Sequence, residues 1–240
     1  MENKYRDVVM VPLNEDEVLI MACDSCGAVG MKEQDQVKAP PYIVGKYTAR
    51  VSLMEVISLG AKVVCITVNI CNELDPTGQA VLEGIRSELE ECSIQVPITF
   101  STEKNMMTNM TAVGVTVVGV GNRKDLLLNQ SASGDFVYVI GIPKVGSEVV
   151  EDQGKIAHTA VLLQLLKVDG IKEIIPIGSS GIEGELDKFL QANQLNVEYA
   201  RNLPVDMKKS AGPCTAMLVI CKGELLTEGN IPQNLIGRLY

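Results

Sequence analysis

Two acidic residues follow apolar runs at places where a carboxylate could do chemistry. Asp24 ends one extended run and enters a glycine-bearing loop, and Glu103 lies just after another such run. Strand ends are where α/β proteins usually assemble their sites, and carboxylate oxygens are preferred ligands of hard cations. Taken alone, Asp24 is more often a turn-capping residue, so a structural role and a functional role both stay open.

A third acid, Glu55, lies in a polar stripe on an otherwise apolar segment and is the only acid between Gln36 and Asn72. At 3.6 residues per turn, Thr48, Ser52 and Glu55 fall within about 60° of one another on a helix. A carboxylate there must face water, a partner or a metal ion. The pattern leaves a solvated helix face and a functional face equally open.

The stretch Ser101-Thr102-Glu103-Lys104-Asn105 brings hydroxyls, a carboxylate and a lysine together after an apolar run. This composition suits a strand-end site, although a plain polar loop is the favoured interpretation of the stretch alone. Two glycine turns, Gly178 to Gly181 and Ser210 to Pro213, could present amide groups to an anion. Such turns are usually plain connections, and neither fits a Walker A loop or a dinucleotide-binding fingerprint.

Redox, zinc and histidine chemistry are poorly supported. Cys23 and Cys26 have redox spacing, but no helix is signalled after them, and a zinc site would need two further ligands. The single histidine, His158, lies in an amphipathic segment and is expected to be a packing or surface residue.

Composition excludes several classes of protein. The chain has 240 residues, 46% of them hydrophobic, and a net charge of -9 without a long basic run. This balance argues against nucleic-acid and membrane partners. Residues 1–7 carry charges where a signal peptide would need its apolar centre, and the longest apolar stretch is too short to span a bilayer. We expect a cytoplasmic protein with reduced cysteines.

Hydrophobic patterning predicts an α/β protein with two domains, 1–128 and 129–240, joined through the polar segment 122–134. In the first domain, strands are expected at 7–13, 17–23, 62–70, 96–100 and 112–120, with helices at 45–59 and from residue 75. In the second domain, strands are expected at 136–142, 173–177, 197–200 and 216–221, with helices at 155–166 and 183–192.

The order and spacing of these features resemble the AIR synthase-like superfamily, which includes thiamine monophosphate kinase and selenophosphate synthetase. Cys23-Asp24 resembles its strand ending in Asp, and Met54-Glu55-Val-Ile-Ser-Leu-Gly60-Ala61 its Ser-Asp-x-x-x-x-Gly-Ala helix. Ser101-Thr102-Glu103 stands for Gly-Gly-Asp/Glu-Thr and is followed by the strand Ala112-Val-Gly-Val-Thr-Val-Val-Gly119. The chain departs from the family in Glu at 55, in Ser-Thr for Gly-Gly, and in a shorter second half of about 110 residues.

One branch is similar in more detail, the alpha-ribazole kinases of Firmicutes. The shared motifs are Asp24-x-x-Gly27, Gly30-x-Lys-Glu-x-Asp35, Thr48-Ala-Arg50-Val, Gly178-Ser-x-Gly181-Ile and Ser210-Ala-Gly-Pro213. The resemblance implies ATP-dependent phosphorylation of alpha-ribazole, or a similar nucleoside, to its 5′-phosphate in cobalamin salvage. The alternatives are another phosphotransferase, such as one like thiamine monophosphate kinase, and a nucleotide-binding regulatory protein without catalysis.

The resemblance also implies a fold and a site. It implies a PurM-like two-domain fold, in which the N-terminal sheet forms a barrel across a homodimer and the C-terminal α/β domain is shortened. Asp24 and Glu103 would be catalytic and, with Glu55, would hold Mg²⁺. The residues expected to bind ATP are Lys32, Lys46, Arg50, Ser52, Ser101, Thr102, Lys104 and Asn105.

Overall fold

The computed structural model describes residues 4–225 and 230–240, and the chain separates into two compact units. Unit 1 comprises Met1–Ile57 and Ala61–Lys124, and unit 2 comprises Ser58–Gly60 and Asp125–Tyr240. The sequence predicts a boundary after residue 128, whereas the units divide after Lys124.

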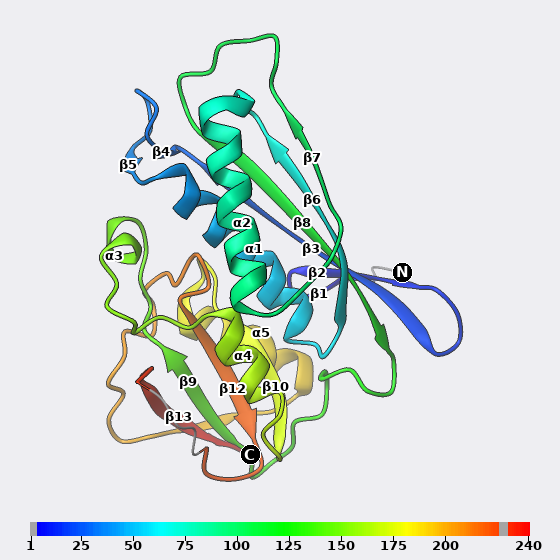
Figure 1. Cartoon of the computed structure of the whole chain (residues 1–240). Helices are drawn as coiled ribbons and strands as arrows, with labels where there is room; N and C mark the ends of the chain where they lie inside the picture. Colours follow the sequence, from blue (N-terminus) through cyan, green and yellow to red (C-terminus); the bar gives the residue numbers. More distant parts are fainter. Residues whose placement is uncertain (1–3, 226–229) are drawn as a thin grey trace. The chain divides into compact units, whose positions relative to one another are not determined.

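Unit 1 is built on a six-stranded sheet with the order β1-β2-β3-β8-β6-β7 (Figure 1). Its strands are β1 (Lys4–Tyr5), β2 (Val8–Pro12), β3 (Glu17–Gly27), β6 (Lys62–Ile70), β7 (Ile98–Thr102) and β8 (Ala112–Asn122). Neighbouring strands are antiparallel except β6 and β7, which are parallel. Within the described residues the sheet has two edges, β1 and β7, and does not close into a barrel.

Two helices, α1 (Pro41–Ile57) and α2 (Gln79–Glu91), cover one face of this sheet (Figure 1). On β8, Val113, Val115 and Val117 are buried, whereas the alternate residues are only partly buried. This alternation is expected of a strand covered on one face. The short strands β4 (Val29–Gly30) and β5 (Val37–Lys38) form a separate parallel pair, and a π-helical turn, η1 (Leu74–Gly78), leads into α2.

The contact between the two helices, here called the α1–α2 seam, depends on two glycines. A Cβ atom at Gly45 would overlap the carbonyl oxygen of Val81, and one at Gly84 would overlap the carbonyl oxygen of Tyr42. Only residues without a side chain allow the backbones to approach this closely. The seam therefore fixes the position of α1 against α2 at both glycines.

Unit 2 is built on a five-stranded antiparallel sheet with the order β10-β12-β9-β13-β11. Its elements are β9 (Phe136–Gly141), α3 (Ser147–Val150), α4 (Thr159–Leu165), β10 (Ile171–Pro176), α5 (Gly181–Asn193), β11 (Val197–Tyr199), β12 (Ala216–Cys221) and β13 (Gln233–Leu239). Ile182, Leu186 and Phe189 of α5 pack into a buried cluster with side chains of the sheet. The helix thereby covers one face of the sheet.

Most predicted elements are present, with shifted ends. The strands predicted at 62–70 and 216–221 agree with β6 and β12, whereas the helix predicted at 155–166 is only Thr159–Leu165. Helix α1 begins at Pro41, four residues before the predicted start, because proline is well tolerated in the first turn of a helix. The sequence pattern missed α3 and β13; β13 mixes polar residues with a glycine, and its pairing with β9 and β11 defines it.

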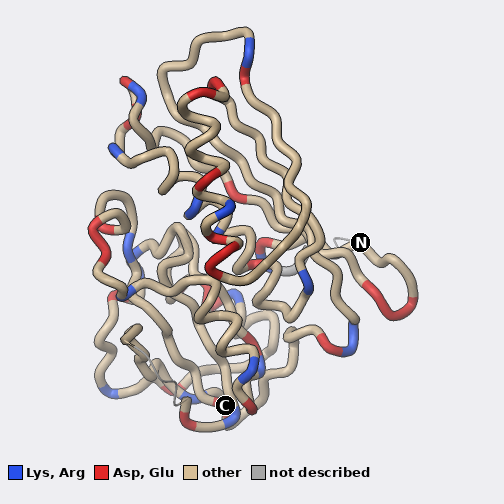
Figure 2. Tube along the Cα trace, in the orientation of Figure 1, with Lys and Arg blue, Asp and Glu red and all other residues tan. Residues whose placement is uncertain are grey.

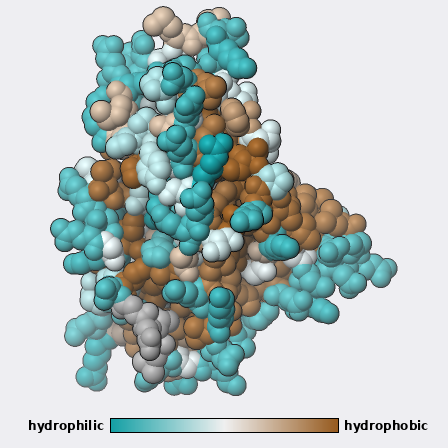
Figure 3. All heavy atoms as spheres, viewed as in Figure 1, coloured by the Kyte–Doolittle hydropathy of each residue, from teal (hydrophilic) through white to brown (hydrophobic). Residues whose placement is uncertain are grey.

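Figures 2 and 3 show where charged and hydrophobic residues lie in the structure. Acidic and basic positions are interspersed in both units (Figure 2). Figure 3 shows a hydrophobic area on unit 1. The exposed apolar side chains of its strands include Val9 and Val11 of β2 and Phe100 of β7. None of the helices in the described ranges is long and apolar enough to cross a membrane.

Candidate functional site

The sequence predicts Asp24 at the end of a strand. In the structure Asp24 lies inside strand β3. Its strand continues because β3 stays paired with β8 as far as Gly27, and Asp24 itself lies opposite Val115. Asp24 shares a side of the strand with Ile20 and Ala22, which are buried. Burial raises the pKa of the Asp24 carboxyl above its ordinary value, and a hydrogen bond from the Ser25 amide offsets part of this effect.

The register of the sheet brings several predicted residues to one end of it. Thr102 of β7 pairs with Ile70 of β6, which pairs with Val113 of β8, which pairs in turn with Cys26 of β3. These four paired residues form one row across the sheet. Asp24 and Glu103 each lie within a few residues of this row. We call this region, with its flanking loops, the polar end of the sheet.

Glu103 follows β7 at this end and stabilises a tight turn. Its carboxylate accepts hydrogen bonds from the amides of Asn105 (2.7 Å) and Met106 (3.1 Å). These bonds lower the pKa of Glu103 below its ordinary value. Ser101, Lys104 and Asn105 are exposed beside it and Thr102 is partly buried.

The polar stripe of α1 faces the protein interior and not solvent. Thr48, Ser52 and Glu55 are 2%, 0% and 7% exposed. The Thr48 hydroxyl donates to the carbonyl of Val44, and the Ser52 hydroxyl donates to the carbonyl of Val115 at 3.0 Å. Because Ser52 is used in the contact between helix and sheet, its predicted contact with ATP is disfavoured.

The predicted magnesium site is not assembled. Among the residues that the structure describes, no group of three or more His, Cys, Asp or Glu side chains is placed to hold a metal ion. Glu55 is buried on α1, whereas the Glu103 carboxylate is turned toward the amides of its own loop. The donor set Asp24, Glu55 and Glu103 therefore does not by itself fit a bound Mg²⁺ in this arrangement.

Cys26 lies close to Asp24 and Thr48 but has no signs of a reactive thiol. Burial raises the pKa of this thiol most, the negative charge of Asp24 raises it further, and a hydrogen bond with Thr48 lowers it in part. A thiol with a raised pKa stays protonated at neutral pH and is a poor nucleophile. The absence of a redox role for the Cys23-x-x-Cys26 pair stays a prediction.

Arg50, predicted to contact phosphate, is committed to the α1–α2 seam. Its guanidinium donates to both carboxylate oxygens of Glu88, at 3.0 and 2.7 Å, and lies 4.4 Å from the centre of the Tyr47 ring. The two charged side chains are only 5% and 2% exposed. Arg50 thus has a structural role in this structure, because breaking a buried ion pair is costly, and its contact with phosphate stays a prediction.

The other predicted cations are more accessible. Lys32 pairs with Glu73 at 2.8 Å and Lys46 pairs with Glu91, and these glutamates are 39% and 53% exposed. Lys104 is exposed in the loop after Glu103. The side chains of Lys32 and Lys46 are themselves 19% and 16% exposed. Because their glutamate partners reach solvent, separating these pairs costs less than separating a buried pair, so these lysines can turn toward an anionic ligand.

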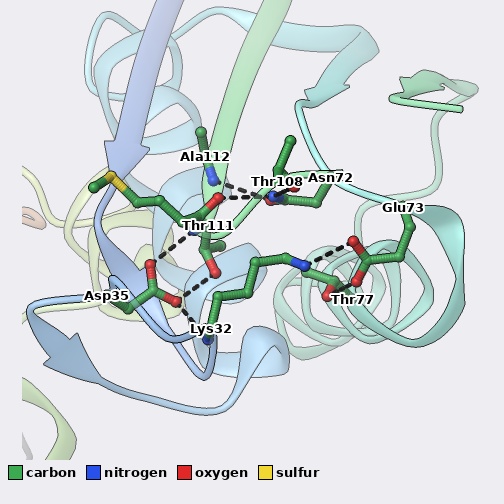
Figure 4. A network of polar contacts seen from close by, with 9 residues as sticks. Lys32, Asp35, Asn72, Glu73, Thr77, Thr108, Thr111 and Ala112 are labelled. Carbon is green, nitrogen blue, oxygen red and sulfur yellow. Dashed lines mark hydrogen bonds and ion pairs between the residues drawn. The ribbon is translucent and has the colours of Figure 1, made fainter. Parts of the chain in front are cut away.

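Two buried polar residues that the sequence analysis gave no role organise the loops of the polar end (Figure 4). Asp35 is 5% exposed and accepts hydrogen bonds from the Lys32 amide (2.8 Å) and from the amide and hydroxyl of Thr111 (both 2.7 Å). Burial alone would raise the pKa of Asp35, but these hydrogen bonds lower it below the ordinary value. Gly30 belongs to the same cluster, since a Cβ there would overlap the Thr111 hydroxyl.

Asn72 is the second of these residues and is completely buried. Its side-chain oxygen accepts the amide of Ala112 (3.0 Å), and its side-chain nitrogen donates to the Thr108 hydroxyl (2.7 Å) and the Met110 carbonyl (2.8 Å) (Figure 4). A polar residue at the end of an apolar strand was the only available sequence signal. Its partners lie 36 to 40 residues away and could not be inferred from spacing.

The glycine turns of unit 2 are ordinary connections in this structure. The Ala211 amide donates to the carbonyl of Gly178, which ties the two predicted turns together. Ser180 accepts a hydrogen bond from Lys188 of the following helix at 3.2 Å. These contacts agree with the structural interpretation of both turns.

Comparisons with known proteins match this fold. Residues 5–120 match the family model described as AIR synthase related protein, N-terminal domain. Among curated proteins no match is found. Several solved structures are similar over nearly the whole chain.

Thiamine monophosphate kinase from Aquifex aeolicus is 14% identical, with a TM-score of 0.66 over 98% of this chain and 89% of that one. Its complex with AMPPCP and TMP is 15% identical, with a TM-score of 0.63 over 97% and 84%. Phosphoribosylformylglycinamidine synthase II from Thermotoga maritima is 14% identical, with a TM-score of 0.61, and this chain spans 37% of its length. At these identities the likeness shows the fold alone. Residues 5–120 therefore match an AIR synthase-related N-terminal domain, within a chain whose fold is similar to that of thiamine monophosphate kinase.

Proposed function

We propose that this chain is an ATP-dependent kinase that phosphorylates a small-molecule alcohol. The observation that carries the proposal is the likeness of fold to thiamine monophosphate kinase over nearly the full length of both chains. One structure of that enzyme is a complex with AMPPCP, an analogue of ATP, and TMP. A likeness that includes both units favours a kinase over a protein that shares only one domain with this family.

In the proposed reaction, the acceptor hydroxyl oxygen forms a bond to the γ-phosphorus of ATP. The bond from that phosphorus to the β–γ bridging oxygen breaks, ADP leaves and the hydroxyl proton is released. Phosphoryl transfer relies mainly on positioning and on neutralising charge. Asp24 and Glu103, at the polar end of the sheet, are the proposed catalytic residues, and Asp24, whose pKa is raised, is the better proton acceptor of the two.

Lys32, Lys46 and Lys104 are the proposed phosphate contacts, joined by the exposed polar groups of Ser101 and Asn105. Lys32 and Lys46 would exchange an accessible glutamate for phosphate. Thr102 follows Ser101 and is the last residue of strand β7. Magnesium stays a prediction, and no step is assigned to it, because the three proposed ligands are not gathered among the described residues.

The acceptor is proposed to be alpha-ribazole, on the strength of the sequence motifs shared with alpha-ribazole kinases. A thiamine-type phosphate ester is the second candidate, since the thiamine monophosphate kinase complex contains TMP. Transfer to alpha-ribazole forms a phosphate ester at a hydroxyl, whereas transfer to thiamine monophosphate forms a phosphoanhydride at its phosphate. The two proposals therefore differ in the acceptor group and in the bond formed.

We also propose that a second copy of the chain covers the exposed face of the unit 1 sheet. Val9 and Val11 of β2 are 43% and 39% exposed on this face, which the helices leave open. Neighbouring exposed apolar residues commonly mark a protein interface. Molar mass measured by light scattering should therefore be that of a dimer, and Val11→Asp should shift it toward the monomer.

The deciding experiment measures phosphate transfer from ATP, with and without Mg²⁺, to alpha-ribazole and to thiamine monophosphate. We expect ADP and a phosphorylated product with one acceptor, and a loss of about 100-fold in kcat for Glu103→Gln. Glu148→Gln in unit 2 is the matched control, because Glu148 also accepts a backbone amide, from Val145. ADP formation at background rate with every acceptor would overturn the kinase, and tight ATP binding without transfer would favour the regulatory alternative.

A further inference from the structure

We infer that Asn72 is a positioning residue for the proposed transfer, because its contacts fix the loop that carries Glu103 and Lys104. The catalytic part of this inference rests on the proposed function. The ordering of the loop rests only on contacts within unit 1 and can be tested without any activity.

Asn72 joins the ends of three strands. It lies two residues after β6, and its carbonyl oxygen accepts the amide of Glu103, just after β7, at 3.0 Å. Its side-chain oxygen accepts the amide of Ala112, the first residue of β8, also at 3.0 Å. One residue thus holds the beginning and the end of the loop 103–111.

The side chain of Asn72 directs its oxygen and both of its N–H donors to this loop. A primary amide has one acceptor oxygen and two N–H donors. The oxygen is taken by Ala112, and the nitrogen donates to the Thr108 hydroxyl and the Met110 carbonyl. Because Asn72 is 0% exposed, water cannot replace a lost partner. Asp would lack both donors at neutral pH, and Ser would be too short to reach all three groups.

Only the tip of the loop escapes this restraint. Met106 and Met107 are 73% and 96% exposed, whereas Thr111 is fully buried and bonded to Asp35. Glu103 lies at the fixed beginning of the loop and Lys104 follows directly. Small displacements of reacting groups lower a reaction rate by large factors. The fixed ends of the loop are therefore expected to keep the Glu103 carboxylate in position for catalysis.

Trypsin provides a direct test of the ordering. Lys104 is the only Lys or Arg between Arg86 and Arg123, so cleavage there is identified unambiguously by a fragment that begins at Asn105. We expect Asn72→Asp to raise the initial rate of cleavage after Lys104 by about tenfold, because two buried acceptors lose their donors. Ile85→Ala, which opens a cavity in buried helix α2 away from the loop, is the control for general destabilisation. Cleavage that is unchanged in Asn72→Asp, or raised equally by Ile85→Ala, would overturn the inference.

The catalytic part is tested by kinetics with ATP and whichever acceptor the wild-type protein uses. Asn72→Asp should lower kcat by about tenfold or more with little change in the KM for the acceptor. Protonation gives the introduced carboxyl group one donor again, so the ratio of variant to wild-type kcat should rise between pH 8 and pH 6. Ile85→Ala should show no such rise. A wild-type kcat in Asn72→Asp would overturn the positioning role, whereas a wild-type protein without turnover would overturn the proposed function and leave the trypsin result to decide the ordering.

Discussion

The α1–α2 seam and the polar end of the sheet both pair cations with carboxylates, but at different depths. In the seam, Arg50 and Glu88 are nearly inaccessible and make two parallel hydrogen bonds. At the polar end, Lys32 is 19% exposed and pairs with a glutamate that is 39% exposed. A buried pair cannot release one partner without stranding the other, whereas an exposed pair can. Depth therefore separates cations that hold the fold from cations that can meet a ligand.

The strongest test of this distinction is the Glu88→Gln substitution in the seam. We expect it to lower the free energy of unfolding by about 3–5 kcal/mol, because Arg50 is left as an uncompensated buried charge. Denaturation with urea gives this quantity. The double variant Arg50→Met with Glu88→Leu should recover most of the stability. Wild-type stability in Glu88→Gln, together with weakened ATP binding, would instead return Arg50 to the proposed site.

A smaller effect is expected for Asp35→Asn at the polar end. Replacing the carboxylate turns an amide N–H₂ toward the donors of Lys32 or Thr111, which should cost about 1–3 kcal/mol at pH 7. The pKa of Asp35 is lowered by folding, so its ionised form stabilises the protein above the ordinary value of 3.8. This contribution is lost as the pH falls through the lowered pKa. The difference in stability between wild type and variant should therefore shrink below pH 3.8, and a difference independent of pH would contradict the assignment.

Lys32→Met should change stability by less than about 1 kcal/mol, because its pair with Glu73 is partly exposed. Its effect should appear in the KM for ATP, raised about tenfold by the loss of a charged phosphate contact. Lys188→Met, which removes an exposed lysine from a pair with Glu185 in unit 2, is the matched control. Equal KM values for the two variants would show that Lys32 has no part in binding ATP.

The smallest change in stability, and of opposite sign, is expected for Asp24→Asn. Folding raises the pKa of Asp24, so the folded state binds its proton more tightly than the unfolded state does. Stability must then fall as the pH rises from 3.8 through the raised pKa, and an ionised Asp24 destabilises the protein at pH 7. The variant should unfold at a slightly higher temperature than wild type at pH 7, without a gain below pH 3.8, and should lose turnover. A lower unfolding temperature at pH 7 would contradict burial as the dominant cause.

The sequence predicted most of the elements but not the residues with which they pair. The strand at 62–70 was predicted correctly because alternating hydrophobicity and β-branched residues are local signals in the sequence. Asp24 was misplaced at a strand end because the pairing that extends β3 to Gly27 involves β8, almost 90 residues later. The roles of Arg50 and Asn72 were missed for the same reason, since Glu88 and Ala112 are distant in sequence. The type of a residue shows that its side chain is charged. Its burial and its hydrogen-bond partner decide whether it has a structural role or can bind a ligand.

The strand order of unit 1 has a consequence for the synthesis of the chain on the ribosome. Strand β8 is the last of the six to be made, yet it lies in the middle of the sheet, between β3 and β6. Until residue 122 has emerged, the β1-β2-β3 and β6-β7 portions have no strand to join them, and each presents an unpaired edge. We therefore expect nascent chains that end before β8 to be the form most prone to aggregation and most dependent on chaperones.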